Sequence, residues 1–137
     1  MEPNYTEGDT IFITHTSNFD RFDVVIVKVE KLTGDEYFIK RVIGLPGDEV
    51  VIVNNSIYIN GSLIDDDEYI QDGQVTTCST GPNGQVSDEC TWLVGNNEYF
   101  VLGDNRMYSN DSRSSIVGLI KDENMYGEVI VKLDLFD

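Results

Sequence analysis

One lysine lies in a largely apolar segment of the sequence. Lys40 belongs to residues 37–43, where the alternation of a strand places it on one face with Phe38 and Val42. Burial among apolar neighbours disfavours the charged ammonium and lowers its pKa, and a neutral lysine amine can act as a general base. The segment alone equally fits an edge strand whose lysine discourages aggregation. The lysine therefore indicates proton-transfer chemistry only if a suitable partner exists.

A second segment, residues 103–113, combines charged and hydroxyl side chains. It reads GDNRMYSNDSR and follows a predicted strand. Two aspartates, two arginines and interleaved serines are enough to build a buried network of ion pairs and hydrogen bonds behind a site. They could also form a solvated loop with side-chain turns. The composition of this segment leaves both interpretations open.

Several common catalytic and metal-binding designs are absent from the sequence. The only histidine, His15, lies between two threonines at the end of a predicted strand, and we interpret it as a surface residue. There is no HExxH zinc motif, no glycine-rich phosphate loop and no GxSxG element. The acidic run at residues 65–68 lacks the spacing of a calcium loop, so a solvated loop is expected there. We expect neither a metal nor a cofactor.

The elements that must position these residues are mostly strands. Segments rich in β-branched residues and bounded by polar clusters predict strands over residues 10–14, 23–29, 36–43, 49–53, 56–59, 98–102 and 126–133. Residues 65–93 have a loop-like composition, and only residues 112–124 could form a short helix. At 137 residues the chain is expected to be one domain, mainly β, with a loop-rich insertion over about residues 56–96.

The net charge restricts the possible partners. The formal charge is −16, from 25 acidic and 9 basic residues. Such a chain lacks the basic surface that binds nucleic acid or anionic lipid, so neither is expected as an electrostatic partner. No apolar run approaches the roughly 20 residues of a membrane-spanning helix.

Two cysteines, Cys78 and Cys90, lie in the loop-like region. Too few other ligands lie nearby for a metal site. Two cysteines 12 residues apart in a polar loop suit a disulfide in an oxidising compartment. Two free thiols in a reducing compartment remain the alternative on composition alone.

The two chemical segments resemble those of a known family. Residues 40–48, KRVIGLPGD, resemble the lysine box of bacterial type I signal peptidases, and residues 103–113 match their GDNRxxSxDSR box at every fixed position. The stretch from Met1 to Pro3, followed by Gly8 and Asp9, is similar to the segment that begins one residue after the family's nucleophilic serine. Residues 54–61, NNSIYING, resemble a hairpin of the family's non-catalytic insertion. The resemblance extends to about Asp134.

The resemblance implies a role for each matching residue. Lys40 would be the general base of a Ser–Lys dyad, and Ser109 would orient its amine. The supporting ion-paired network would consist of Arg41, Asp104, Asp111 and Arg113. The substrate pockets would be lined by Met1, Tyr5, Ile11, Phe38 and Ile39. Shallow pockets of this kind admit small residues, so the implied substrates are signal-peptide segments of secreted preproteins that end in Ala-X-Ala.

The resemblance also implies a location and a fold. The fold would consist of the antiparallel sheets of this family with its inserted hairpin region. The enzyme would act at the cell membrane, with its catalytic domain on the extracytoplasmic side and an N-terminal anchor that this chain lacks. An extracytoplasmic site favours a disulfide between Cys78 and Cys90, which would stiffen the insertion rather than the site.

The chain departs from the family pattern at a few positions. The nucleophilic serine would precede Met1, so we expect the 137-residue chain by itself to be inactive. Asn4 stands where the family usually has Thr, and Phe22 where it usually has Gly. Three alternatives stay open: a catalytically inactive relative that acts in pilus assembly, a self-cleaving repressor-type Ser–Lys protease, and a non-enzymatic β domain that binds peptide strands.

Overall fold

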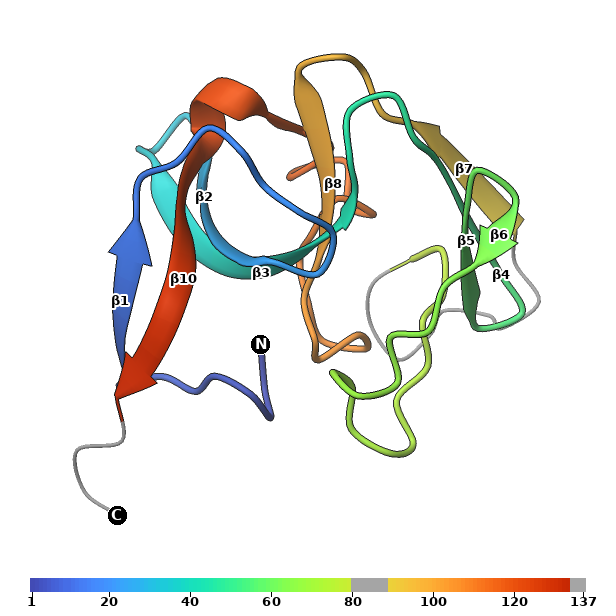
Figure 1. Cartoon of the computed structure of the whole chain (residues 1–137), viewed down its shortest axis with the longest axis horizontal. Coiled ribbons are helices and arrows are strands. Elements are labelled where there is room, and N and C mark those ends of the chain that lie inside the picture. The colour runs from blue at the N-terminus through green and yellow to red at the C-terminus, as the bar shows by residue number, and fades with distance from the viewer. Residues whose placement is uncertain (80–88, 134–137) are drawn as a thin grey trace.

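The chain folds into two antiparallel sheets, as its computed structural model shows for residues 1–79 and 89–133 (Figure 1). The larger sheet has the strand order β1-β10-β2-β3-β8-β9, and the smaller has the order β6-β5-β4-β7. The larger sheet consists of β1 (Thr10–Thr14), β2 (Val24–Val29), β3 (Glu36–Gly44), β8 (Glu98–Leu102), β9 (Ile120–Lys121) and β10 (Met125–Leu133). The smaller sheet consists of β4 (Glu49–Val53), β5 (Ser56–Ile59), β6 (Ser62–Leu63) and β7 (Glu89–Leu93). The mainly β fold class is confirmed.

Two hydrophobic clusters hold the sheets together. Val25, Val42 and Val101 are fully buried in the first cluster, within the larger sheet. The second cluster joins β3 and β8 to the smaller sheet, because Ile43 and Phe100 pack with Val50 and other residues of that sheet. Successive residues of β3 and β8 therefore point to opposite faces of the sheet, one into each cluster, as the alternation of side chains along a strand requires.

Each of the seven strands predicted from the sequence is present, and its bounds differ by at most one residue. The loop-like interpretation of residues 65–93 was wrong at its end, where β7 pairs with β4 along Glu49–Val53. The alternation in β7 is short, and polar and turn-forming residues precede it, which hid the strand. The smaller sheet begins at Glu49, so it includes a strand that precedes residue 56, the expected start of the insertion.

Residues 112–124, where a short helix was thought possible, are mostly non-helical. Only a single 3-10 turn, η1 (Asp122–Asn124), occurs there, next to the short strand β9. The preceding residues are tied to β8, because Ser112 exchanges hydrogen bonds with Val101 through its amide and its hydroxyl. Gly118 has a φ of 65°, a left-handed conformation that ends a helical turn.

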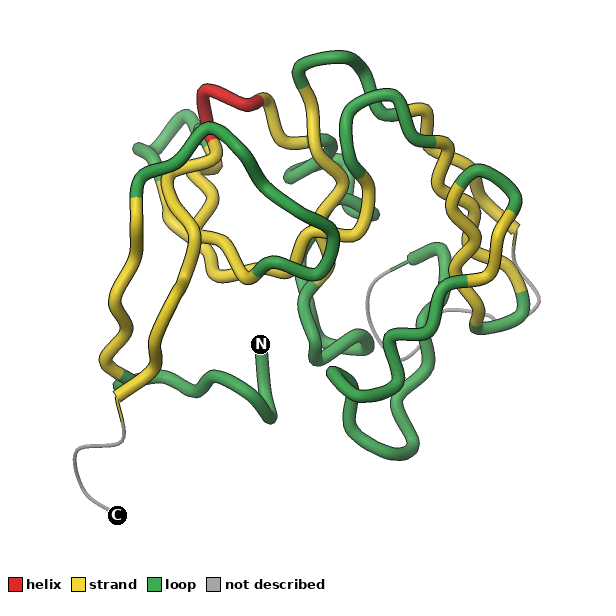
Figure 2. The backbone as a smooth tube through the Cα atoms, in the orientation of Figure 1, coloured by secondary structure: helices red, strands yellow, loops and turns green. Residues whose placement is uncertain are grey.

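The long segment after β6 returns from the smaller sheet toward the N-terminus and the loop that follows β8 (Figure 2). Its contacts are specific. Asn4 donates a hydrogen bond to the Tyr69 carbonyl, and the Gln74 side chain accepts one from the Met107 amide. Loop residues 66–78 therefore lie against both the N-terminal segment and residues 103–113.

Candidate active site

Lys40 is buried on β3, in the middle of the larger sheet. It pairs with Val25 of β2, and its side chain lies on the same face as Phe38, whose ring centroid is 5.5 Å from the Lys40 Nζ atom. Only 6% of the residue is exposed. Its Nζ atom donates a hydrogen bond of 3.0 Å to Ser109 Oγ. The lysine thus has the partner that the sequence segment alone could not supply.

The pKa of Lys40 is lowered below its ordinary value of 10.5. Burial is the largest cause, because it penalises the charged ammonium. The carboxylate of Asp111 acts in the opposite direction and the guanidinium of Arg113 adds to the lowering, while Asp104 again favours the charged form. The lowered pKa increases the fraction of neutral amine near neutral pH, and the neutral amine can accept a proton.

Ser109 reaches Lys40 because Gly103 has no side chain. A Cβ atom at residue 103 would overlap the Ser109 hydroxyl, would lie 2.5 Å from Ser109 Cβ and would lie 3.5 Å from Lys40 Nζ. Gly103 also donates its amide to Asp111 Oδ2 at 3.1 Å. The start of the 103–113 segment is therefore packed directly against the hydrogen-bonded pair.

Two buried carboxylates are each held by an arginine. Arg113 donates to both oxygens of Asp111, at 2.9 and 2.8 Å, and the side chains of both residues are completely buried. Arg41 donates to both oxygens of Asp104 in the same way, also at 2.9 and 2.8 Å. Two-pronged pairs of this kind fix geometry as well as charge. The structure thus brings together all four residues of the expected network.

The roles implied by the resemblance leave out a third buried arginine, the other arginine of residues 103–113. Arg106 is fully buried, is paired with Asp66, and hydrogen-bonds the Thr76 hydroxyl at 3.0 Å and the Gly103 carbonyl at 2.9 Å. Asp66 belongs to the acidic run that was expected to be a solvated loop, and for this residue that expectation was wrong because it is only 8% exposed. The residues around Asp66 in the sequence do not indicate that it is buried, since its partner Arg106 is 40 residues away.

Tyr69 is a further residue without a sequence signal. The guanidinium of Arg41 lies over its ring, 3.8 Å from the centroid, and the Phe22 ring lies 5.3 Å from it, centroid to centroid. A cation over an aromatic face is an attractive contact. Tyr69 of loop residues 66–78 thus packs against the Arg41 guanidinium of the Arg41–Asp104 pair.

Lys40 and Ser109 lie at an open groove of about 590 Å³. Every residue expected to line the substrate pockets lines this groove, namely Met1, Tyr5, Ile11, Phe38 and Ile39. The acidic residues Glu2, Glu7 and Asp9 also line it. His15, in contrast, is exposed and hydrogen-bonds the Tyr126 carbonyl.

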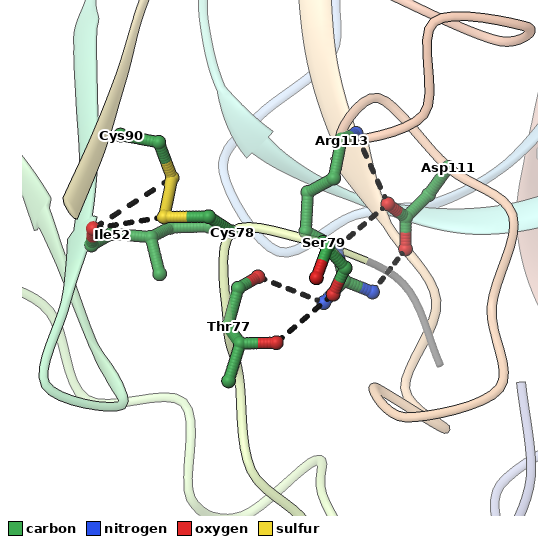
Figure 3. Close-up of a disulfide and its surroundings, with 7 residues drawn as sticks. All are labelled: Ile52, Thr77, Cys78, Ser79, Cys90, Asp111 and Arg113. Carbon is green, nitrogen blue, oxygen red and sulfur yellow. Dashed lines mark hydrogen bonds and ion pairs between the residues drawn. A yellow bond between two sulfur atoms is a disulfide. The ribbon is translucent and has the colours of Figure 1, made fainter. Parts of the chain in front are cut away.

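The disulfide between Cys78 and Cys90 joins loop residues 66–78 to β7 (Figure 3). Both sulfur atoms lie near the Ile52 carbonyl of β4, at 3.6 and 3.7 Å. Thr77, the residue before Cys78, accepts a hydrogen bond of 3.2 Å from Arg113 through its carbonyl oxygen. The disulfide is therefore linked to Asp111 through Thr77 and Arg113.

Within residues 1–79 and 89–133, no group of three or more potential ligands among His, Cys, Asp and Glu could hold a metal ion. No helix in those ranges has the length and apolar character needed to cross a bilayer.

A buried lysine that is hydrogen-bonded to a serine at an open groove has the chemical means to transfer a proton. Comparison with known proteins gives the family. The model of the family "Signal peptidase, peptidase S26" matches residues 1–133. The chain therefore belongs to this family of serine peptidases.

The curated relatives that it matches are named signal peptidase I. Signal peptidase I S of Bacillus subtilis is 35% identical over 132 residues, which cover 93% of this chain and 68% of the relative. A signal peptidase I of Bacillus amyloliquefaciens is 35% identical over 139 residues, covering 93% and 67%. The chain thus spans about two thirds of the length of these relatives.

A crystal structure of a signal peptidase I from Enterococcus faecalis V583 has the same fold. Its TM-score is 0.63 at 27% identity, and the match covers 83% of this chain and 97% of that one. The resemblance seen in the sequence is confirmed, and the function is that of signal peptidase I.

Proposed function

We propose that this chain supplies the general base and the substrate groove of a Ser–Lys signal peptidase I. One observation carries the catalytic part of the proposal. The Lys40 amine is buried, has a lowered pKa, and lies 3.0 Å from Ser109 Oγ at the groove. Ser109 orients the amine, and the Asp111–Arg113 and Arg41–Asp104 pairs hold the segments that carry it.

The nucleophile in this proposal is a serine that precedes Met1 in a longer polypeptide. Met1 lines the same groove as Lys40, and the charge on Lys40 contributes to lowering the pKa of the Met1 amine, after burial as the larger cause. A residue attached to that nitrogen would therefore lie close to the lysine. The 137-residue chain alone would bind a substrate segment weakly and would not cleave it.

The reaction follows from these positions. Neutral Lys40 takes the proton of the serine hydroxyl while the serine oxygen bonds to the carbonyl carbon of the scissile peptide. The tetrahedral intermediate then breaks its C–N bond, and the Lys40 ammonium gives its proton to the leaving amine. Water, activated by the same amine, hydrolyses the acyl-enzyme.

The proposal takes a preference for small residues from the family. The groove has apolar walls from Phe38, Ile39 and Ile11, against which the small side chains of a segment ending in Ala-X-Ala would pack. We place the domain at the cell membrane on the extracytoplasmic side, held there by an anchor that precedes this chain. The disulfide supports that side, since such bonds persist in oxidising compartments.

A cleavage assay tests the proposal. The natural polypeptide, extended upstream of Met1 to include the serine and its preceding segment, is incubated with an Ala-X-Ala signal peptide, and the products are weighed by mass spectrometry. We expect cleavage after the second Ala, and none with the 137-residue chain or with Lys40→Met. Lack of cleavage by the extended protein would favour the inactive relative that acts in pilus assembly.

A further inference from the structure

The first residues of the chain form a compact turn beside the groove. The amides of Asn4 and Tyr5 both donate to the Met1 carbonyl, at 3.0 and 3.1 Å. The turn is fastened to distant parts of the chain by the Asn4 side chain. Its single Nδ2 atom donates to Asp104 Oδ2 at 2.8 Å and to the Tyr69 carbonyl at 2.7 Å.

Asp104 contacts both the N-terminal turn and β3. It is fully buried and takes two hydrogen bonds from Arg41, the neighbour of Lys40 on β3. Its own amide lies 3.2 Å from Met1 Sδ. Gly103, the residue before it, packs against Ser109. Asp104 therefore links the N-terminal turn to Arg41, the neighbour of Lys40, and it follows Gly103, which packs against Ser109.

Asparagine is suited to this position because its amide nitrogen carries two hydrogens. Both are used here, one on a carboxylate and one on a main-chain carbonyl. A threonine hydroxyl has one hydrogen and could serve only one of the acceptors. Leucine has a similar size and could serve neither, and aspartate would place a second negative charge against Asp104.

We propose that Asn4 is a positioning residue for the nucleophile. By holding the N-terminal turn on Asp104 and Tyr69, it fixes the residue that precedes Met1 relative to the Lys40 amine. Asn4 does not touch Lys40 or Ser109, so it acts through placement alone. This inference rests on the proposed Ser–Lys function, and it concerns how the serine is aligned rather than which residue is the base.

The kinetic test uses the extended, serine-containing polypeptide. Asn4→Leu should lower kcat about 10- to 100-fold, because a displacement of about 1 Å between reacting groups has effects of that order. KM should change less than kcat, although Met1 and Tyr5 line the groove, and the pH midpoint of kcat should stay unchanged because Asn4 does not contact Lys40. Asn4→Thr should recover part of the loss, and the exposed control Asn18→Leu should change nothing. A kcat of Asn4→Leu within twofold of the parent would overturn the proposal.

A second measurement does not depend on activity. In the 137-residue chain, Asn4→Leu should speed hydrogen exchange of the Asn4 and Tyr5 amides about tenfold or more, with β2 and β3 unaffected. Unchanged exchange at residues 4 and 5, or faster exchange throughout β2 and β3, would overturn the local positioning role. If the parent enzyme fails to cleave, the proposed function fails, and the exchange result still decides whether Asn4 fixes the turn.

Discussion

The Lys40 amine lies 3.0 Å from the Ser109 hydroxyl, although 69 residues separate them in the sequence. Neither segment is unambiguous alone, since a strand lysine and a polar loop both have ordinary structural explanations. Their contact inside the protein, at a groove, is what turns them into one site. Predictions about activity and stability follow from this pair and its surroundings.

Lys40→Met in the extended polypeptide should reduce kcat/KM by about a thousandfold or more, because methionine cannot accept the serine proton. Lys40→Arg should be as inactive, since a guanidinium stays protonated. In the parent enzyme, kcat/KM should rise as the pH increases through the lowered pKa of Lys40, because only the neutral amine is a base. A peptide-cleavage assay between about pH 5 and 10 measures both effects.

The matched control is Lys28→Met on β2, a partly exposed lysine whose Nζ lies 3.8 Å from a Glu30 carboxylate oxygen. It should keep normal activity, since exposed pairs contribute little. Substantial cleavage by Lys40→Arg would refute the assignment of Lys40 as the base.

The stability of the 137-residue chain should depend on pH through Lys40. Because burial lowers its pKa in the folded protein, the unfolded chain binds the proton more tightly. Stability therefore rises with pH between the lowered pKa and the ordinary value of 10.5, as the penalty of a buried charge disappears. A tenfold difference in proton affinity corresponds to about 1.4 kcal/mol.

Lys40→Met lacks this dependence. Its free energy of unfolding should exceed that of the parent most at pH values below the lowered pKa, and the excess should shrink toward pH 10.5. Urea denaturation of both proteins at several pH values measures the difference. A difference that stays constant with pH would show that the lysine keeps an ordinary pKa in the folded state.

Gly103→Ala should damage the site without removing a catalytic group. The new Cβ would overlap the Ser109 hydroxyl, so the serine must move away from Lys40. We expect kcat to fall about 10- to 100-fold and stability to fall by about 1–3 kcal/mol from overpacking.

Gly34→Ala separates this effect from backbone strain. Gly34 lies between β2 and β3 with a φ of 123° and no atom within 4 Å of an added Cβ. It should lose about 1–3 kcal/mol of stability through strain, with kcat unchanged. Equal kcat values for the two alanine variants would mean that the close approach at Gly103 does not matter to the site.

The sequence predicted most of the fold because its strands are long and rich in β-branched residues, as in β2 and β3. The resemblance to the family, carried by the boxes at residues 40–48 and 103–113 and by the segment from Met1, also predicted which residues meet at the groove. The sequence did not predict Tyr69 or the Asp66–Arg106 pair. These contacts join loop residues to partners 28 to 40 positions away, and nothing in the composition of a polar loop indicates where it docks. The short strand β7 was hidden for a related reason, since its pairing with β4 is decided by the tertiary fold.

Replacing both cysteines by alanine should lower stability more than activity. In the chain-entropy account, a link between residues 12 apart contributes about 3 kcal/mol by restricting the unfolded chain. Thr77, beside Cys78, accepts a hydrogen bond from Arg113, but Arg113 keeps its two-pronged pair with Asp111 when the disulfide is absent. We therefore expect the free energy of unfolding to fall by about 3 kcal/mol, with kcat of the extended enzyme within about threefold of the parent.

Urea denaturation and the cleavage assay measure the two quantities, and Ser115→Ala, a change at an exposed serine, is the control. A much larger loss of kcat in the folded double variant would show that the disulfide holds the Asp111–Arg113 pair in place. Two alkylatable thiols in protein made under oxidising conditions would show instead that the bond does not form.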